Sequence, residues 1–207
     1  MNHRLIGGLV AAALACAAHP ALAQQAGNFT LGIGAHQVQP KSNNGTLLNG
    51  TAKLEIGDNV QPTITFEYFF RDNLGIEVLA ATPFKHDIDI KGLGKVATTK
   101  HLPPTFSLQY HWNSQGTVSP FVGVGVNYTT FFSEKTTGPL RGAKLKLEDS
   151  VGVAAHVGVD FILNERGAIR VDARWMDIGS DVKLNGTKIG KANIDPFVYG
   201  LAYVIKF

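Results

Sequence analysis

Cysteine is almost absent from this chain: the only one among the 207 residues is Cys16. It lies in an N-terminal segment with the parts of a signal peptide, namely Arg4, the apolar stretch Leu5 to Ala18, and the small-x-small site Ala21-Leu22-Ala23. We predict that residues 1–23 are a cleaved signal peptide and that 24–207 form the mature domain. The mature chain then lacks cysteine, which excludes disulfides and thiol chemistry.

Two other interpretations of this segment are open. A membrane-anchoring helix would need a longer apolar run, uninterrupted by His19 and Pro20. A lipoprotein would need a better lipobox than Ala13-Leu14-Ala15-Cys16.

Long apolar runs and an excess of one charge are also missing. No later stretch reaches about 18 consecutive apolar residues, so the sequence predicts no helical membrane span. Without Arg4, 18 Lys and Arg remain against 16 Asp and Glu, a formal charge of +2. This balance gives no reason to expect a nucleic-acid partner. The length fits one domain.

What the chain does have is strict alternation, clearest in residues 196–207. Phe197, Tyr199, Leu201 and the later odd positions are bulky, whereas the even positions include Gly200 and Ala202. A strand would place the bulky set on one face. In a soluble protein that face would be the core. In an outer-membrane barrel it would face lipid, and the small residues would face the lumen.

The same alternation recurs along the whole mature chain. It predicts eight strands: 28–36, 61–71, 74–82, 104–112, 120–132, 150–162, 168–176 and 196–207. Long connections (38–60, 84–101, 133–149 and 177–195) alternate with short ones, as in outer-membrane barrels, where the short turns are periplasmic. The bulky faces carry almost no charge, unlike the exterior of a soluble barrel. We predict an all-β, eight-stranded antiparallel transmembrane β-barrel with four long extracellular loops, in the outer membrane of a Gram-negative bacterium.

Exposed aromatic residues should anchor such a barrel at the two membrane interfaces. One predicted belt contains Phe70, Trp112, Phe161 and Phe207, and the other contains Tyr128, Trp175 and Phe197.

The lumen-facing residues divide into a charged and an apolar group. Charges of both signs lie toward the periplasmic ends, where they must pair to offset desolvation and should close the barrel. The predicted periplasmic plug consists of Glu67, Glu77, His111, Asp160, Arg170, Asp172 and Lys206. The predicted apolar lumen above it consists of Leu79, Ala81, Gly123, Gly125, Phe131, Val198, Gly200 and Ala202. The charged residues are equally consistent with a purely structural role.

An apolar ligand gains nothing by crossing a charged layer, so transport would need an exit through the wall. Proline removes a ladder hydrogen bond. Pro83 ends one predicted strand, and Pro103 and Pro104 begin its neighbour at the same outer level. We predict a weakened seam there; the alternative is that these prolines only end the strands.

A metal site is one rival interpretation. His36, His86 and His101 could meet at the rim, with Asp87 and Asp89 nearby. Their spacing matches no tight ligand motif, and solvated loop histidines explain them equally simply.

Two enzyme interpretations are weaker. Ser107, His111 and Asp160 are the only set that could supply a nucleophile and a base, and polar lumen packing also explains them. The pair Gly123-x-Gly125 lies inside a strand with no helix after it, so it predicts room in the lumen and no dinucleotide site. We therefore expect no catalytic activity and no cofactor.

Several segments carry a family resemblance. Residues 79–86 (Leu-Ala-Ala-Thr-Pro-Phe-Lys-His), 101–105 (His-Leu-Pro-Pro-Thr) and 120–132 (Pro-Phe-Val-Gly-Val-Gly-Val-Asn-Tyr-Thr-Thr-Phe-Phe) resemble the OmpW family. The match continues through 149–150, 157–160 and 175–178. The resemblance implies an eight-stranded outer-membrane barrel with a narrow apolar lumen, and its AlkL branch is associated with hydrocarbon uptake. Family members often carry a bulky aromatic after the Asp-Ser pair, where this chain has Val151, so the resemblance implies a more open lumen or a different gate.

Together these features predict a narrow hydrophobic pore for passive uptake of small apolar molecules, with lateral release into the membrane. The alternative is a closed structural or surface-recognition barrel whose loops contact host, phage or toxin. The expected partners are outer-membrane lipid or lipopolysaccharide and small hydrophobic molecules, with the protein acting as a monomer.

Overall fold

The computed structural model describes residues 24–207, so the predicted signal peptide and Cys16 lie outside the described residues. Within residues 24–207 no helix is long and apolar enough to cross a membrane.

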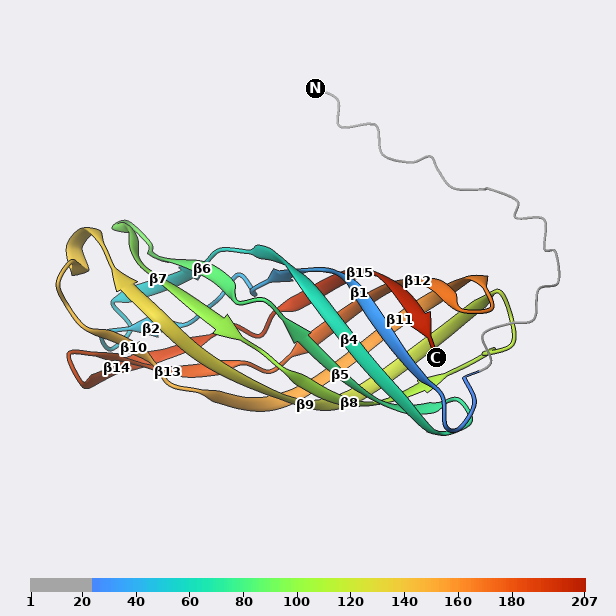
Figure 1. The fold of residues 1–207 in the computed structure, drawn as a ribbon. Coiled ribbons are helices and arrows are strands. Elements are labelled where there is room, and N and C mark those ends of the chain that lie inside the picture. The colour runs from blue at the N-terminus through green and yellow to red at the C-terminus, as the bar shows by residue number, and fades with distance from the viewer. Residues whose placement is uncertain (1–23) are drawn as a thin grey trace, which may run out of the picture.

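Eight strands form a closed antiparallel barrel (Figure 1). They are β1 (Phe29–Gln39), β4 (Asn59–Arg71), β5 (Leu74–Ala81), β8 (Thr105–His111), β9 (Val118–Thr136), β11 (Ser150–Asn164), β12 (Gly167–Met176) and β15 (Phe197–Lys206). Each strand pairs with the next, and β15 pairs with β1 from Thr30↔Lys206 to Gln39↔Phe197, which leaves no free edge. The predicted barrel is confirmed, with strand ends shifted by a few residues.

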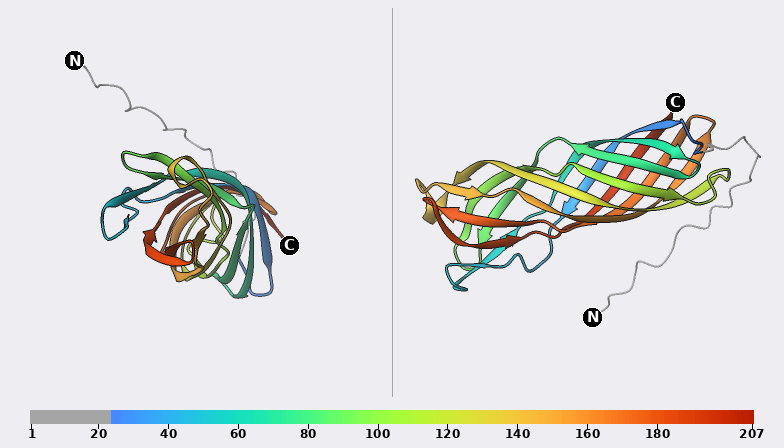
Figure 2. Two further views of the ribbon diagram at one scale, coloured as in Figure 1. Left: turned by 90° about the vertical axis from the view of Figure 1, so that its left-hand side faces the viewer. Right: turned by 90° about the horizontal axis from the view of Figure 1, so that it is seen from below.

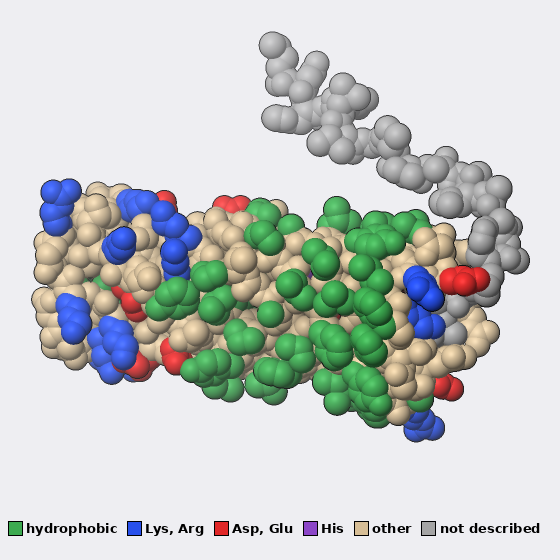
Figure 3. Space-filling view, viewed as in Figure 1, with side chains coloured by type: hydrophobic (Ala, Val, Ile, Leu, Met, Phe, Trp, Pro, Cys, Tyr) green, Lys and Arg blue, Asp and Glu red, His purple; other side chains and the backbone are tan. Residues whose placement is uncertain are grey.

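The bulky residues of each strand face outward, as the alternation predicts. Ile33, Val124 and Leu201 are 54%, 61% and 59% exposed, whereas the lumen-facing Thr63 and Val198 are buried. Hydrophobic side chains cover the middle of the barrel, and Lys and Arg lie toward its two ends (Figure 3). An apolar surface of this extent is stable only against lipid.

Two of the three short turns between barrel strands contain a single residue with left-handed backbone geometry. Asn73 has φ 63° between β4 and β5, and Asn113 has φ 52° after β8. Asparagine tolerates this region better than most residues. The turns place both ends of the described chain at the periplasmic end of the barrel.

The four predicted long connections are present, and each contains one or two short strands that the sequence did not predict. They contain β2 (Thr46–Leu47), β3 (Ala52–Ile56), β6 (Phe84–Ile90), β7 (Gly94–Leu102), β10 (Leu145–Leu147), β13 (Gly179–Leu184), β14 (Thr187–Asn193) and the short 3₁₀ helix η1 (Gly138–Leu140). These strands pair in the order β10-β13-β14-β2-β3-β6-β7, and β7 pairs with the outer end of β9. We call this unit the outer sheet; it extends the barrel at its extracellular end (Figure 2).

A single apolar core connects the outer sheet to the barrel. It includes Leu54 and Leu147 in the outer sheet and Leu79, Met176 and Val198 in the barrel. Short alternating segments such as Leu145-Lys146-Leu147 form strands because their apolar residues pack against those of the neighbouring strands. The Asn, Gly and Ser residues between them hide this alternation in the sequence.

Candidate functional site

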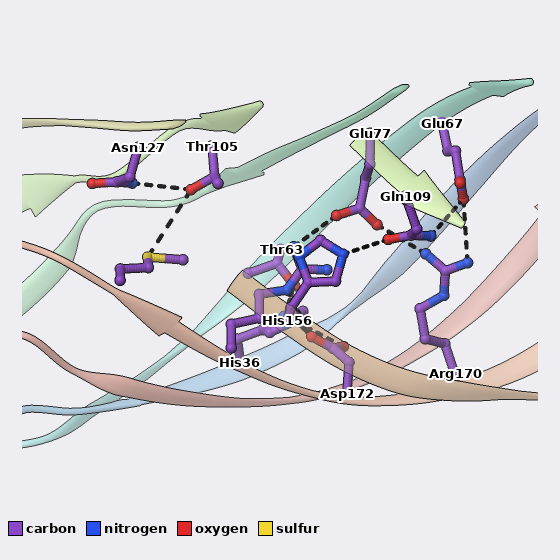
Figure 4. A network of polar contacts seen from close by, with 12 residues as sticks. His36, Thr63, Glu67, Glu77, Thr105, Gln109, Asn127, His156, Arg170 and Asp172 are labelled. Atoms are coloured by element: carbon purple, nitrogen blue, oxygen red, sulfur yellow. Dashed lines mark hydrogen bonds and ion pairs between the residues drawn. The ribbon is translucent and has the colours of Figure 1, made fainter. Parts of the chain in front are cut away.

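A buried ionic network fills the lower and middle lumen, and Arg170 lies at its base (Figure 4). Its guanidinium donates two hydrogen bonds to Asp160, at 2.7 and 2.9 Å, and one to Glu77 at 2.9 Å. Its Cζ lies 4.4 Å from the centre of the Phe121 ring. Arg170 is 1% exposed, so its charge is compensated by these contacts and by Glu67, which accepts a longer hydrogen bond from Arg170 Nη2 at 3.4 Å.

Arg174 forms the upper half of the same network. It donates to Glu77 at 2.6 Å and to Asp172 at 2.7 Å. His36 Nε2 lies 3.2 Å from Asp172 Oδ1, and His36 Nδ1 lies 2.6 Å from the Thr63 hydroxyl. Glu77 therefore bridges both arginines and joins the two halves.

A second row of polar side chains lines the opposite wall. Gln109 donates to Glu67 at 2.9 Å, and its carbonyl oxygen lies 2.6 Å from His156 Nε2. His111 Nε2 lies 3.0 Å from Glu67 Oε1. Four carboxylates, two guanidiniums and three imidazoles thus occupy the lower and middle lumen, where an apolar molecule would gain little.

The structure brings together six of the seven predicted plug residues: Glu67, Glu77, His111, Asp160, Arg170 and Asp172. Lys206 lies lower, half-buried beside a cavity that it lines with Gln24 and Asp160. The prediction omitted Arg174, His36, Gln109 and His156. Arg174 shares its parity with Arg170 and Asp172, so the sequence contained the signal for it.

An apolar cavity of about 10 Å³ lies directly above the network. It is lined by Leu79, Ala81 and Val198 from the predicted apolar lumen, together with Val38, Phe84, Met176 and His101. Phe131 packs edge-on against His101 at 5.7 Å.

The other four predicted apolar-lumen residues lie lower. A Cβ added at Gly200 would meet His36 and Asp172, and one at Gly123 would meet His156. Ala202 pairs in register with Arg170, and Gly125 packs on Ser107. Gly123, Gly200 and Ala202 therefore lie at the level of the polar network. Their small size makes room for its large side chains, because the barrel interior holds little more than side chains.

Val151 has no role in the lumen. It is 71% exposed and faces outward, so the expectation that its small size opens the lumen or shifts the gate is wrong.

The wall between β5 and β8 has an interrupted hydrogen-bond ladder at the predicted prolines. Register pairing ends at Leu79↔Thr105 and resumes at Phe84↔His101 in the β6–β7 hairpin. Between these points, Thr82 N–H donates to Pro62 on β4, and the Pro104 carbonyl accepts from Tyr128 on β9. We call the segments 80–83 and 102–104 the seam. The backbone on one side of it is hydrogen-bonded to β4, and the backbone on the other side to β9.

Each side of the seam has its own support. Asn127, which is fully buried, donates from its side-chain amide to the carbonyls of Pro103 and Pro104, at 3.1 and 3.2 Å. On the other side, a hollow of about 300 Å³ in the outer wall is lined by residues that include Ile33, Ala80, Ala81 and Thr63. Ala81 and Thr63 also line the cavity inside the barrel.

The predicted rim histidines separate into two sites. His36 belongs to the ionic network, so its predicted place at the rim is wrong. His86 and His101 stack with ring centroids 4.8 Å apart, and Asp87 pairs with Lys95 at 2.7 Å. Among residues 24–207, no three side chains of His, Asp, Glu or Cys come together as a metal site.

The candidate nucleophile also lacks a base. The Ser107 hydroxyl has no hydrogen-bond partner among the described residues. His111 is engaged with Glu67, and Asp160 with Arg170.

Burial changes the protonation of the stacked histidines, which lie in β6 and β7, beyond the apolar belt. Desolvation lowers the pKa of His86 below its ordinary value of 6.5, although the Gly57 carbonyl and the charges of Asp58 and Asp87 oppose this shift. Desolvation, and then the charge of His86, lowers the pKa of His101 well below 6.5.

We expect the β6–β7 hairpin to lose stability in acid. Both imidazoles are neutral above pH 6.5. Below this pH the histidines of the unfolded hairpin bind protons that those of the folded hairpin do not. The free energy of unfolding therefore decreases as the pH drops, by at most about 1.4 kcal/mol per pH unit for each histidine. Hydrogen-exchange protection factors of β6 and β7 should decrease between about pH 7.5 and about pH 5.5. The double variant His86→Phe/His101→Phe should lack this decrease. Equal pH dependence in the two proteins would contradict the assignment.

The closed barrel, its apolar belt and its sealed interior define the class: this is an eight-stranded outer-membrane β-barrel. The OmpW family model matches residues 25–207, and the chain belongs to the OmpW family. The resemblance seen in the sequence is confirmed, and the protein is placed in the Gram-negative outer membrane.

Individual relatives agree with this assignment. Outer membrane protein W of Vibrio cholerae serotype O1 is 38% identical over 100% of both chains. Outer membrane protein AlkL of Ectopseudomonas oleovorans is 31% identical over 72% of this chain and 67% of its own. The crystal structure of the outer membrane protein OprG from Pseudomonas aeruginosa has 34% identity and a TM-score of 0.81, covering 90% of this chain and 99% of that one.

Proposed function

We propose that the protein is a monomeric, narrow pore for passive uptake of small hydrophobic molecules. The observation that carries the proposal is the continuous apolar core from the outer sheet to the ionic network. At its outer end a cavity of about 40 Å³ is lined only by aliphatic side chains, among them Leu54, Ile90, Leu147 and Val182. At its inner end it includes the cavity lined by Leu79 and Val198. The AlkL resemblance, which implies hydrocarbon uptake, supports the same function.

Release is lateral, through the seam. The ionic network below the cavity offers an apolar molecule no favourable contact, because burial of apolar surface is what drives its entry. The seam lacks ladder hydrogen bonds, and Ala81 lies between the inner cavity and the outer hollow. The cavities are small in this closed form, so passage requires the apolar side chains of the outer sheet and the seam to separate transiently.

The substitution Ala81→Trp tests this route. A bulky ring between the two hollows should impose an overpacking barrier of roughly 1–3 kcal/mol, which lowers uptake roughly 5- to 150-fold. Uptake of an n-alkane would be measured in cells that carry wild-type protein, the variant or none. Val157→Phe, an equally apolar change on the lipid face, should leave uptake unchanged.

The comparison with cells that lack the protein decides between the two functions. Equal alkane uptake with and without wild-type protein would favour the closed structural or surface-recognition barrel. If uptake depends on the protein but is the same with Ala81→Trp as with wild type, only the lateral route is contradicted.

A further inference from the structure

The stacked pair His86 and His101 lies where the outer sheet meets the inner cavity. The rings are nearly parallel, with an interplanar angle of 8°, and are 2% and 0% exposed. His101 also stacks on Phe84, with centroids 5.6 Å apart, and lines the apolar cavity with Leu79 and Met176. Two polar rings are thus embedded in apolar packing at the top of the proposed route.

The hydrogen bonding of this pair is incomplete. His86 Nδ1 contacts the Gly57 carbonyl. His86 Nε2 and both ring nitrogens of His101 have no partner among the described residues. A neutral imidazole has one donor and one acceptor in either tautomer, so His101 carries one of each, unmatched. Buried polar groups are nearly always hydrogen-bonded, and an exception at a cavity indicates that something else supplies the partner.

We propose that His101 is the polar subsite of a ligand site and binds a single uncharged oxygen group on an otherwise apolar molecule, such as a ketone, aldehyde or alcohol. The cavity of about 10 Å³ has room for one water in this closed form, so the apolar tail enters as Leu79, Met176 and Val198 separate, and the oxygen meets a ring nitrogen of His101. This proposal rests on the proposed function. It narrows the substrate class from small hydrophobic molecules in general to those that carry one hydrogen-bonding oxygen group.

The chemistry of the lining favours an uncharged group. A carboxylate would have to leave water for a cavity in which no arginine or lysine is a lining residue. The other polar ring there, His36, is already engaged with Thr63 and Asp172. A ketone oxygen can accept from the ring N–H of His101, and an alcohol can accept from it or donate to the other ring nitrogen, at a far smaller desolvation cost.

The experiment compares two probes of equal chain length, 2-octanone and n-octane, on the full protein in lipid nanodiscs. Binding is measured by saturation-transfer NMR, with protein-free nanodiscs correcting for partition into lipid. Wild-type protein should prefer 2-octanone. His101→Phe keeps the ring and its stacking but removes both nitrogens, so it should reduce 2-octanone binding about 3- to 10-fold and leave n-octane unchanged. Val157→Phe, a change on the lipid face outside the cavity, should alter neither.

A measurement on the wild-type protein does not depend on the variant folding. The ¹⁵N resonances of the His101 ring should shift on addition of 2-octanone and remain unchanged with n-octane. Unchanged probe preference in His101→Phe, or equal ring shifts with both probes, would overturn the polar subsite and leave the pore intact; a bound water as the partner of His101 would give this result. Binding of neither probe above the nanodisc background would overturn the proposed function itself.

Discussion

Replacing Glu77 with alanine is expected to destabilise the barrel by about 3–5 kcal/mol, because it breaks two buried ion pairs and leaves one donor of each guanidinium without its acceptor. Glu77 is 1% exposed and accepts hydrogen bonds from Arg170 at 2.9 Å and from Arg174 at 2.6 Å. Without it, the two guanidiniums lose the carboxylate that bridges them and offsets their mutual repulsion.

The measurement is urea unfolding of the protein in lipid vesicles, supported by its heat-resistance on gels. Lys188→Ala provides the control, since Lys188 pairs with Asp181 at the exposed surface of the outer sheet. Exposed ion pairs contribute little, so this variant should unfold like wild type. If Glu77→Ala also unfolded like wild type, the network would have to be solvated and could not seal the lumen.

Asn127→Leu should weaken the seam, because its side-chain amide is the partner of two proline carbonyls that have no ladder bond to β5. It reaches Pro103 at 3.1 Å, Pro104 at 3.2 Å and the Thr105 hydroxyl at 2.9 Å. Leucine has a similar size but cannot donate. The Pro104 carbonyl keeps its hydrogen bond from Tyr128 N–H, and the Pro103 carbonyl keeps the one from the Thr105 hydroxyl, so the cost is that of the lost hydrogen bonds, about 0.5–1.5 kcal/mol each.

The effect should be local as well as large. Hydrogen exchange of the amides in 79–84 and 101–105 should accelerate in Asn127→Leu, while exchange in β12 changes little. Thr129→Val is the matched control: it removes the hydroxyl that donates to Asn127 at 2.6 Å but does not touch the proline carbonyls. Equal acceleration in both variants would mean that general loosening of β9, and not support of the prolines, explains the result.

Glu77→Ala and Asn127→Leu test two different parts of the barrel, the ionic network and the seam. In the proposed pore, the ionic network closes the periplasmic end, whereas the seam is the place where the wall lacks ladder hydrogen bonds. A barrel of eight strands has little internal space, so a charged layer would be sufficient to close it. The proposed lateral route rests on the position of that layer.

Much of the candidate site was visible in the sequence, because lumen-facing residues follow strand parity. Glu67, Glu77 and Asp172 could be assigned to the lumen from alternation alone. Their partners could not, since parity gives the face of a residue and only an approximate height. His36 was expected at the rim for this reason, although it reaches down to Asp172.

The outer sheet could not be predicted from the sequence either. Its strands are two to nine residues long and are separated by Asn, Gly and Ser, so local composition favours loops. Their pairing partners lie far away in the chain, as with Gly190 on β14 and Leu47 on β2. Strand formation there depends on tertiary packing, which composition does not encode.

The sequence alone determined the eight strands, the face that each turns to lipid, and the membership in an outer-membrane family, because all three follow from a local two-residue period and from continuous motifs. Only the tertiary structure decided that Glu77 joins two arginines, that the long connections form a sheet, and that His101 keeps two unmatched nitrogens above an apolar cavity. These features arise where closure of the barrel brings distant strands to the same height, and the register that sets this height depends on the whole closed sheet.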